Sequence, residues 1–424
     1  MNSENKRIAV IGAGHAGIEA ALAAAAVHAA ELGAEVHLFE KMDRIGLKMG
    51  ITGKGRCNLT NSAPIGDFIA KTPGNGKFLY SAYGRFSNVD LLELLRSWGM
   101  ETVTERGGRV FPKSEDAQEV RHLFMRKLEE TGVQLHLSDP VHHILTEDGR
   151  VSAVQTSRGV FPAEAVILAT GGKSYPRTGS TGDGYRMAEE LGHKVTVLRP
   201  ALIPLVCSND YCRELQGLSL RNVKLTVSAG GRRKAELQGE MIFTHFGISG
   251  PIVLSLSDQV SLWLSQGHAV TGEINLKPAL SEEVLDKRIL RDLAKFHLKQ
   301  MRNALQELLP HRLIDVILHM SDIPSDLGVS ELTKQQRANL RYALQHMPLT
   351  ITGTRPIEEA IVTAGGVSVK EIRSSSMESK LVGGLYFAGE VMDIHAFTGG
   401  YNLQAAFSTG WTAAEYAAGK ADEA

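Results

Sequence analysis

Apolar runs and polar punctuation at the start of the chain predict a strand, a helix and a second strand. A short apolar run at 8–11 leads into closely spaced glycines and an alanine-rich segment, and a second apolar run spans 36–39. Short apolar runs bounded by turns are typical of buried parallel strands, and the longer segment between them favours a helix. We therefore expect a parallel sheet with crossover helices.

The same reading extends to about residue 200. Apolar positions at three-to-four spacing predict helices at 88–99 and 115–131, and alternation with turns predicts a strand meander over 133–161. The segment 165–172, AVILATGG, reads as a buried parallel strand that runs into a glycine turn. This first part of the chain is thus of the α/β class.

The pattern changes near Pro200 and changes back near residue 350. Short strand-like runs with glycine turns fill 200–280, and the pattern from 281 to 346 is helical. GGLYFAGE, at 383–390, then predicts another strand, followed by a helix that starts near Asn402. The domain boundaries predicted from this pattern are 1–195 with 347–424 for a discontinuous cofactor domain, 196–280 for a β-rich insert and 281–346 for a helical insert.

The glycines after the first strand match G-x-G-x-x-G at Gly12, Gly14 and Gly17. Glycine at these positions allows a tight turn, close approach of a pyrophosphate and packing of helix on strand, while the helix N-terminus attracts phosphate. Glu40 closes the motif as the acceptor for an adenosine ribose. It follows Gly17 by 40 − 17 = 23 residues, against about 20 usually, which predicts a first helix one turn longer with His28 on its surface.

Later segments favour FAD over NAD as the dinucleotide. The turn at 170–172 follows the meander and would return the chain to the cofactor, and Gly389-Glu390 follows a strand as an acid facing the ribityl chain or pyrophosphate. The helix near Asn402 would direct its N-terminus at the flavin edge that gains negative charge on reduction. Since no second G-x-G-x-x-G follows a strand, we expect NAD(P)H to dock transiently, or the substrate itself to supply electrons.

Composition and charge exclude several classes. The chain has 424 residues, a net charge of −1 and 43% hydrophobic residues, which are ordinary values for a multidomain globular protein. Its three cysteines, Cys57, Cys207 and Cys212, form neither a disulfide framework nor a metal site and suit the cytoplasm. No apolar stretch reaches about 18 residues, so we expect no membrane span. Between 287 and 346 the net charge is 10 − 6 = +4. Because charged helical faces are usually solvated, we interpret these residues as a solvated surface, with a polyanion-binding face as the alternative.

Several longer motifs lie at 46–61 (GLKMGITGKGRCNLTN), 109–120, 167–185, 243–251 (FTHFGISGP), 360–372 and 377–410. Taken together, they resemble the YhiN/BaiN-like family of bacterial NAD(P)/FAD-dependent flavoprotein oxidoreductases. The resemblance covers nearly the whole chain, in order, and departs at 52–55, where TGKG stands in place of a serine followed by three glycines.

The resemblance implies a split, glutathione-reductase-type FAD domain carrying a β-barrel-like insert and a helical insert, and it implies bound FAD. It also implies two functions that the fold does not separate. The first is reduction of a C=C bond, such as uridine to dihydrouridine in large-subunit ribosomal RNA, with NAD(P)H as donor. The second is a small-molecule oxidase or reductase acting on an amine like aminoacetone or on a steroid or bile-acid enone. The alternative from another class, which the resemblance does not imply, is a non-enzymatic flavin-binding module that contacts RNA or protein.

Candidate site residues follow from these motifs. Cys57, beside Lys54 and Arg56, would have a stabilised thiolate and would donate a proton, or it is a buried, inert cysteine. His245, Asp393, Tyr175 and His395 are further candidates to face the substrate, and no metal ligands are predicted. The predicted cofactor-binding residues are Gly12, Gly14, Gly17, Glu40, Lys41, Lys48, Gly53, Arg56, Cys57, Asn58, Val141, Thr170, Gly171, Gly172, Asp183, Gly389, Glu390, Gly400, Asn402 and Leu403.

Overall fold

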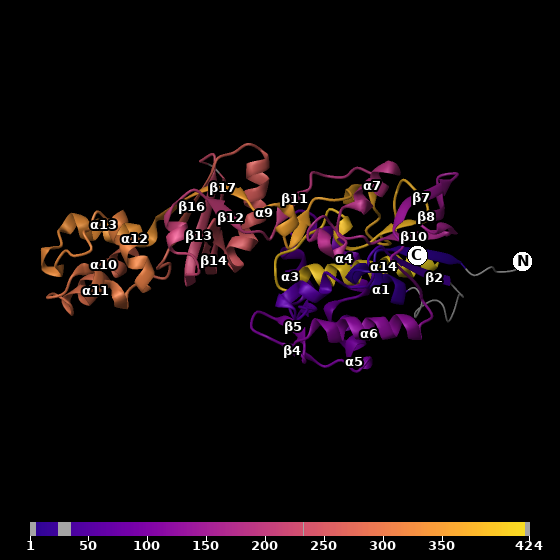
Figure 1. Cartoon of the computed structure of the whole chain (residues 1–424), viewed down its shortest axis with the longest axis horizontal. Coiled ribbons are helices and arrows are strands. Elements are labelled where there is room, and N and C mark those ends of the chain that lie inside the picture. Colours follow the sequence, from indigo (N-terminus) through magenta and orange to yellow (C-terminus); the bar gives the residue numbers. More distant parts are fainter. Residues whose placement is uncertain (1–5, 24–34, 232, 420–424) are drawn as a thin grey trace, which may run out of the picture. The chain divides into compact units, whose positions relative to one another are not determined.

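The computed structural model describes residues 6–23, 35–231 and 233–419. The chain divides into two compact units (Figure 1). We call Met1–Arg199 with Ile357–Ala424 the split unit, and Pro200–Pro356 the inserted unit. The predicted extra turn of the first helix and His28 lie outside the described residues.

A parallel five-stranded sheet forms the centre of the split unit. Its order is β19-β10-β1-β2-β6, and every neighbouring pair is parallel. Such a sheet is buried on both faces, which explains its uninterrupted apolar runs. The strands are β1 (Arg7–Ile11), β2 (Glu35–Glu40), β6 (Gln134–Leu137), β10 (Ala165–Leu168) and β19 (Leu385–Phe387).

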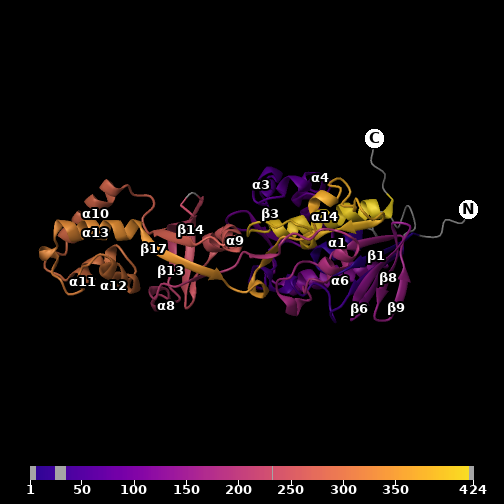
Figure 2. The same cartoon turned by 90° about the horizontal axis from the view of Figure 1, so that it is seen from above.

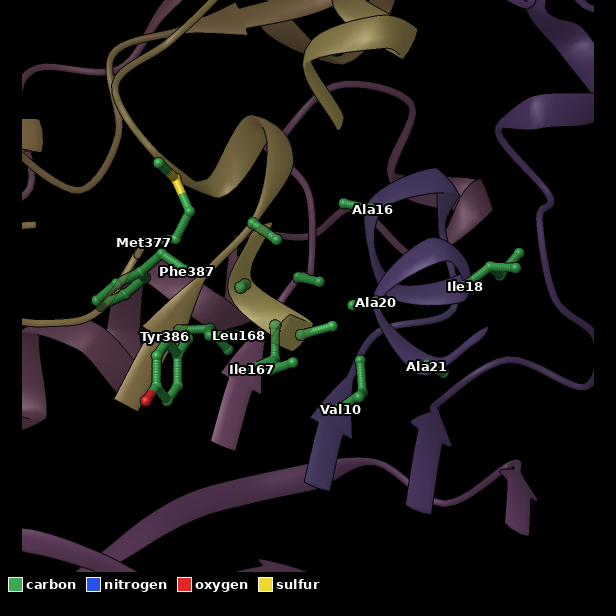
Figure 3. Packing of buried hydrophobic residues seen from close by; sticks show 14 of the residues in the cluster. Val10, Ala16, Ile18, Ala20, Ala21, Ile167, Leu168, Met377, Tyr386 and Phe387 are labelled. Atoms are coloured by element: carbon green, nitrogen blue, oxygen red, sulfur yellow. The ribbon is translucent and has the colours of Figure 1, made fainter. Parts of the chain in front are cut away.

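Two helices from opposite ends of the chain, α1 (His15–Ala23) and α14 (Tyr401–Ala418), pack together beside this sheet. A Cβ added to Gly410 would lie 2.4 Å from the carbonyl oxygen of Ala16, so only glycine allows the two helices to approach this closely. Figure 3 shows the buried side chains of the strands beside those of α1. The other helices of the unit are α3 (Ile65–Ala70), α4 (Tyr80–Arg85), α5 (Asn88–Ser97), α6 (Ala117–Glu130) and α7 (Asp183–Glu190).

Smaller antiparallel sheets complete the split unit. One has the order β3-β5-β4. Most of the meander predicted over 133–161 is the sheet β7-β8-β9, but its first strand, β6, belongs to the parallel sheet. Their strands are β3 (Thr60–Asn61), β4 (Thr102–Thr104), β5 (Arg109–Pro112), β7 (Val141–Glu147), β8 (Arg150–Thr156) and β9 (Gly159–Pro162). Strand β18 (Val362–Ala364) lies outside these two sheets.

The inserted unit is a closed barrel with a group of helices (Figure 2). Closure leaves no free sheet edge. The barrel order is β12 (Leu205–Cys207), β15 (Gly247–Ser249), β14 (Arg233–Thr244), β13 (Ser219–Ala229), β16 (Val270–Asn275) and β17 (Met347–Thr354). The helices are α8 (Tyr211–Glu214), α9 (Pro251–Ser265), α10 (Glu282–Ala294), α11 (Met301–Ala304), α12 (His311–Met320) and α13 (Lys334–Gln345).

Two features of the inserted unit differ from the sequence prediction. Strand β17 belongs to the barrel, so the C-terminal boundary of the compact unit falls after Pro356 and not after residue 346. Its alternating buried and exposed positions fit a barrel wall. Helix α9 occupies part of the region predicted as strands. Its buried residues, such as Ile252, Leu256 and Val260, repeat at helical spacing, but apolar residues also occupy positions between them, which obscures this period in the sequence. Among the described residues, no helix combines the length and apolarity needed to cross a membrane.

Candidate cofactor site

In the loop after β1, the fold requires glycine at two positions but not at a third. Gly12 has φ +99°, and a Cβ on Gly17 would lie 1.7 Å from the carbonyl oxygen of Gly12. Both positions therefore require glycine for the strand–helix turn itself. A Cβ on Gly14, in contrast, would meet nothing within 4 Å. The open space at Gly14 is where a ligand would approach the loop.

Glu40, at the end of β2, is tied to this loop. Its Oε2 accepts a hydrogen bond from Ala13 N at 2.8 Å, and its Oε1 accepts one from Met42 N at 2.9 Å. Burial raises the pKa of Glu40, and these backbone donors oppose that shift. Next to it, the Lys41 ammonium contacts the carboxylate of Asp183 at 2.5 Å. The structure thus brings three predicted residues to one edge of the sheet.

Lys48 and Glu390, which are 342 residues apart, form an ion pair at 2.7 Å. The Lys48 ammonium also donates to Ser174 Oγ at 2.8 Å, and Thr363 N donates to the second Glu390 oxygen at 2.7 Å. A Cβ on Gly172 would lie 2.5 Å from the Thr363 hydroxyl and 2.7 Å from Glu390 Oε1. Both charged side chains are one-fifth exposed, so this polar cluster is shielded but reachable.

The N-terminus of α14 has no side-chain cap among the described residues. Asn58, with its amide oriented to satisfy its neighbours, accepts from Gly400 N at 2.9 Å and donates to Thr60 O at 3.1 Å. The Asn402 side chain bonds the backbone of Ala396 at 2.7 and 2.8 Å, so it fixes the preceding loop. What the helix offers a ligand is therefore the backbone N–H groups of its first turn, up to Leu403.

Of the two alternatives for Cys57, the geometry favours the buried cysteine over the stabilised thiolate. This side chain is fully buried, its backbone has φ +60°, and burial raises the pKa of the thiol to about 12. Arg56 does not compensate, because its guanidinium pairs with Glu105 at 2.8 Å and Glu115 at 3.2 Å. This pairing also speaks against the phosphate contact predicted for Arg56. Lys54 is exposed.

No contact among the described residues brings the remaining substrate candidates together. Asp393 is half-buried, and its backbone makes two hydrogen bonds: its N donates to Val367 O at 2.9 Å, and its O accepts from Asn75 Nδ2 at 2.7 Å. Burial raises the pKa of Tyr175. His245 lies exposed in the turn between β14 and β15 of the inserted unit. Of the other predicted positions, Val141 begins β7, His395 is half-buried, and Gly53, Gly171 and Gly389 have positive φ.

Three functional candidates were missed from the sequence. Glu19 of α1 is fully buried without a hydrogen bond to either oxygen, and burial raises its pKa to about 8. His15, one turn earlier, has an unpartnered Nε2, and burial lowers its pKa to about 3. Asp139 is fully buried beyond β6, with Arg158 Nε 3.9 Å away. A charged residue inside an alanine-rich helix was the available signal for Glu19.

These observations fit a bound dinucleotide. Space is open at Gly14, the first turn of α14 is uncapped, and Thr170 Oγ1 is buried without a hydrogen-bond partner among the described residues. Helix N-terminal N–H groups suit a pyrophosphate and a flavin edge that becomes anionic. Lys48 and Glu390 supply a cation and an acceptor between them.

The model of a family described as "HI0933-like protein Rossmann domain" matches residues 6–416. The chain belongs to this family. It is 33% identical over 413 residues to a 3-dehydro-bile acid delta(4,6)-reductase of Clostridium scindens, covering 97% of this chain and 99% of the relative. It is 31% identical over 417 residues to a ribosomal RNA dihydrouridine synthase of Haemophilus influenzae, covering 96% of each, and 31% identical to its Escherichia coli namesake.

The solved structure of a 3-ketosteroid-delta4-(5alpha)-dehydrogenase from Rhodococcus jostii RHA1 has a similar fold, with a TM-score of 0.52 at 15% identity over 99% of both chains. The predicted family, the α/β fold with its Rossmann-type domain, and the assignment as an FAD-dependent oxidoreductase are therefore confirmed. The residues that hold FAD and the substrate remain predictions.

Proposed function

We propose that this flavoenzyme reduces a C=C bond conjugated to a carbonyl group, with NAD(P)H as the donor and uridine in large-subunit ribosomal RNA as the first candidate substrate. The observation that carries the proposal is the chemistry shared by relatives matched over nearly the whole chain. A 3-dehydro-delta(4,6) steroid has its double bonds conjugated to a ketone. The C5=C6 bond of uridine is likewise conjugated to the C4 carbonyl, and its reduction gives dihydrouridine.

Such a reduction adds hydride at the β-carbon and a proton at the α-carbon. Bound FAD supplies the hydride. In our assignment, the loop at Gly14 and the N-terminus of α1 bind the pyrophosphate, and Glu40 binds the ribose. Lys48 and Glu390 hold the middle of the cofactor, and the N-terminus of α14 stabilises negative charge on the reduced ring.

Cys57 is our candidate proton donor. A donor must carry its proton at neutral pH, and burial, which raises the pKa of Cys57 to about 12, keeps the thiol protonated. Its neighbour Asn58 hydrogen-bonds the residue before α14, so the thiol is adjacent in sequence to a contact with that helix. The competing assignment is a buried cysteine with a packing role only. Cys57→Ser would separate the two by slowing reoxidation by substrate without changing FAD content.

A small-molecule enone is the second candidate substrate, and one observation favours it. The local charge of +4 was counted from residue 287, but the whole helical segment 281–346 has ten basic and nine acidic residues, 10 − 9 = +1. Arg337 pairs with Asp286 at 3.1 Å and Arg341 with Glu282 at 3.6 Å. The electrostatic argument for a polyanion is thereby weakened.

Two measurements test the proposal. In anaerobic mixing, NADH or NADPH should bleach the flavin, and a conjugated ketone or a uridine-containing rRNA fragment should restore its colour. Mass spectrometry of ribosomal RNA from cells lacking the gene should show loss of one dihydrouridine, restored by the wild-type gene. Unchanged dihydrouridine would exclude ribosomal RNA as the substrate and leave a small-molecule enone as the candidate. Stoichiometric peroxide from an amine, with neither acceptor active, would replace the reductase proposal with an oxidase.

We also propose a cytoplasmic location. All three cysteines are free, as is usual in a reducing compartment. Ribosomal RNA and reduced nicotinamides are available there. Fractionation of cells that express the tagged protein would test this.

A further inference from the structure

Ser174 lies where three segments of the split unit meet, and its hydroxyl contacts both members of the Lys48–Glu390 pair. The residue is fully buried, in the turn between β10 and the short helix Pro176–Thr178. Its Oγ accepts from Lys48 Nζ at 2.8 Å and lies 3.4 Å both from Glu390 Oε1 and from the carbonyl oxygen of Ile361. Because the serine is fully buried, it can act on a ligand only through these neighbours.

The backbone on both sides of Ser174 is fixed. Lys173 N donates to Thr363 Oγ1 at 2.8 Å, and Tyr175 N donates to Glu358 O at 3.1 Å. Tyr175 has φ +53°, a conformation that residues other than glycine rarely adopt. Such a backbone persists only where its surroundings hold it, so the hydroxyl of Ser174 has a set position in this turn.

The Lys48 ammonium has three N–H groups, and the contacts with Ser174 and Glu390 use two of them. In the described part of the chain, no hydrogen bond engages the third. Burial and, after it, the Lys48 charge lower the pKa of His15 to about 3, which indicates that the ammonium is near the first turn of α1. The loop at Gly14, to which we assign the pyrophosphate, immediately precedes that turn. The third N–H is therefore the one available to FAD.

We propose that Ser174 is a positioning residue for FAD: together with Glu390 it holds the Lys48 ammonium so that the third N–H is presented to the cofactor. The lysine is then oriented before FAD binds, and it loses little rotational freedom on binding. Charge-assisted hydrogen bonds are strong and directional, so a misplaced ammonium binds the cofactor more weakly. The inference rests on the proposed assignment of Lys48 and Glu390 to FAD and is independent of the substrate.

A double-mutant cycle in FAD binding tests the inference. Full-length apoproteins of the wild type, Ser174→Ala, Lys48→Gln and the double variant are titrated with FAD, and flavin fluorescence gives the dissociation constants. We expect Ser174→Ala to weaken FAD binding about three- to tenfold. In the Lys48→Gln background the same change should alter affinity by less than about twofold, because the serine acts through the lysine. Ser174→Thr keeps the hydroxyl and should restore affinity to within about twofold of wild type.

Ser257→Ala is the matched control for a serine with a structural role only. Ser257 is also fully buried, and it lies in the inserted unit, where its hydroxyl accepts from Ile203 N at 3.0 Å and donates to Leu254 O at 2.7 Å. We expect Ser257→Ala to lower the unfolding midpoint of the apoprotein and to change FAD affinity by less than about twofold.

The possible results separate the role of Ser174 from the assignment of the site. Additive losses in the double variant, or an unchanged affinity of Ser174→Ala, would overturn the positioning role while leaving Lys48 as a ligand of FAD. An unchanged affinity of Lys48→Gln itself would overturn the assignment of the pair to FAD, and the inference with it. If Ser174→Ala does not fold, Ser174→Cys, whose thiol is a weak acceptor, completes the same cycle.

Discussion

The split unit and the inserted unit differ in how far they satisfy their own polar groups. In the split unit, His15 Nε2, Thr170 Oγ1 and both oxygens of Glu19 are buried without hydrogen bonds among the described residues. In the described part of the inserted unit, the corresponding buried atom is Thr244 Oγ1. Since native proteins pair nearly all buried polar groups, the orphans indicate where a ligand or internal water completes the structure.

Charge follows the same division. Most basic residues of 281–346 are engaged inside the inserted unit: Arg288 and Arg291 with Asp292, Lys295 with Glu307, Arg302 with Asp315, Arg337 with Asp286, and Arg341 with Glu282. Arg312 donates to two backbone carbonyls. Most cations of this segment are thus neutralised inside the inserted unit, while the split unit keeps donors and acceptors for a cofactor. The predictions below test this difference.

The largest effect is expected at Gly17. In Gly17→Ala the new Cβ would overlap the carbonyl oxygen of Gly12, which is 1.7 Å away, so β1 and α1 cannot keep their packing. We expect the variant to lose FAD and to lower the unfolding midpoint steeply or yield insoluble protein. Circular dichroism and flavin absorbance measure the two losses.

Gly14→Val is the matched control in the same loop. Its side chain enters open space, so the apoprotein should unfold at the wild-type midpoint, yet the valine occupies the place of the pyrophosphate. We expect FAD to be lost without loss of folding. Normal flavin content in this variant would mean that the loop does not bind the phosphates.

A second prediction concerns the buried carboxyl of Glu19. Its pKa rises from 4.5 to about 8 on folding, so the folded state holds a proton that the unfolded state has released. Stability associated with Glu19 is therefore full below about pH 4.5 and is lost as the pH rises to about 8. Glu19→Gln should abolish this loss, on the order of a few kcal/mol between pH 5 and 9, measured by denaturant unfolding.

Glu93→Gln, on the exposed face of α5, is the control for that experiment and should leave the wild-type pH dependence unchanged. The same decline with pH in Glu19→Gln as in wild type would show that Glu19 is solvated in solution. Glu19 would then no longer count among the buried, unpaired polar groups of the split unit.

The sequence predicted the split unit well because its signals are local. The apolar strands, the loop at Gly12 and the helix after Gly400 each depend on a short run of residues, and all are present. The expectation of FAD came from the family resemblance, and the family model matches residues 6–416.

What the sequence left out depends on contacts between distant segments. The Lys48–Glu390 pair joins residues 342 positions apart, and the partners of Arg56 become visible only once β5 folds beside it. The C-terminal boundary was placed early because β17 pairs with β12, about 140 residues before it. For Cys57 the sequence left a stabilised thiolate and a buried cysteine as alternatives, because sequence proximity to basic residues says nothing about burial.

A third prediction addresses the Lys48–Glu390 pair. Lys48→Gln removes the cation and leaves a shielded carboxylate, so FAD affinity should fall by about ten- to hundredfold. Lys54→Gln, an exposed residue in the same loop, should change affinity by less than about twofold. Titration of apoprotein with FAD, followed by flavin fluorescence, gives both constants. Equal effects of the two changes would show that loop charge, and not the pair, matters.

The smallest effect is expected for the lysines that remain available on the inserted unit. Lys287, Lys299 and Lys334 have no ion pair among the described residues, and they are the cations of 281–346 best able to contact phosphate. If the helical segment carried an RNA-binding face, replacing all three by glutamine would lower the log–log salt slope of rRNA binding by about 2.7, at about 0.9 for each phosphate contact. The net charge of +1 over 281–346 leads us to expect a change below about one and an affinity loss below about threefold. Fluorescence anisotropy of a labelled rRNA fragment at several salt concentrations measures both. A slope change near the larger value would place RNA on the inserted unit and end the contrast between the two units, whereas the smaller value leaves base recognition to the surroundings of the flavin.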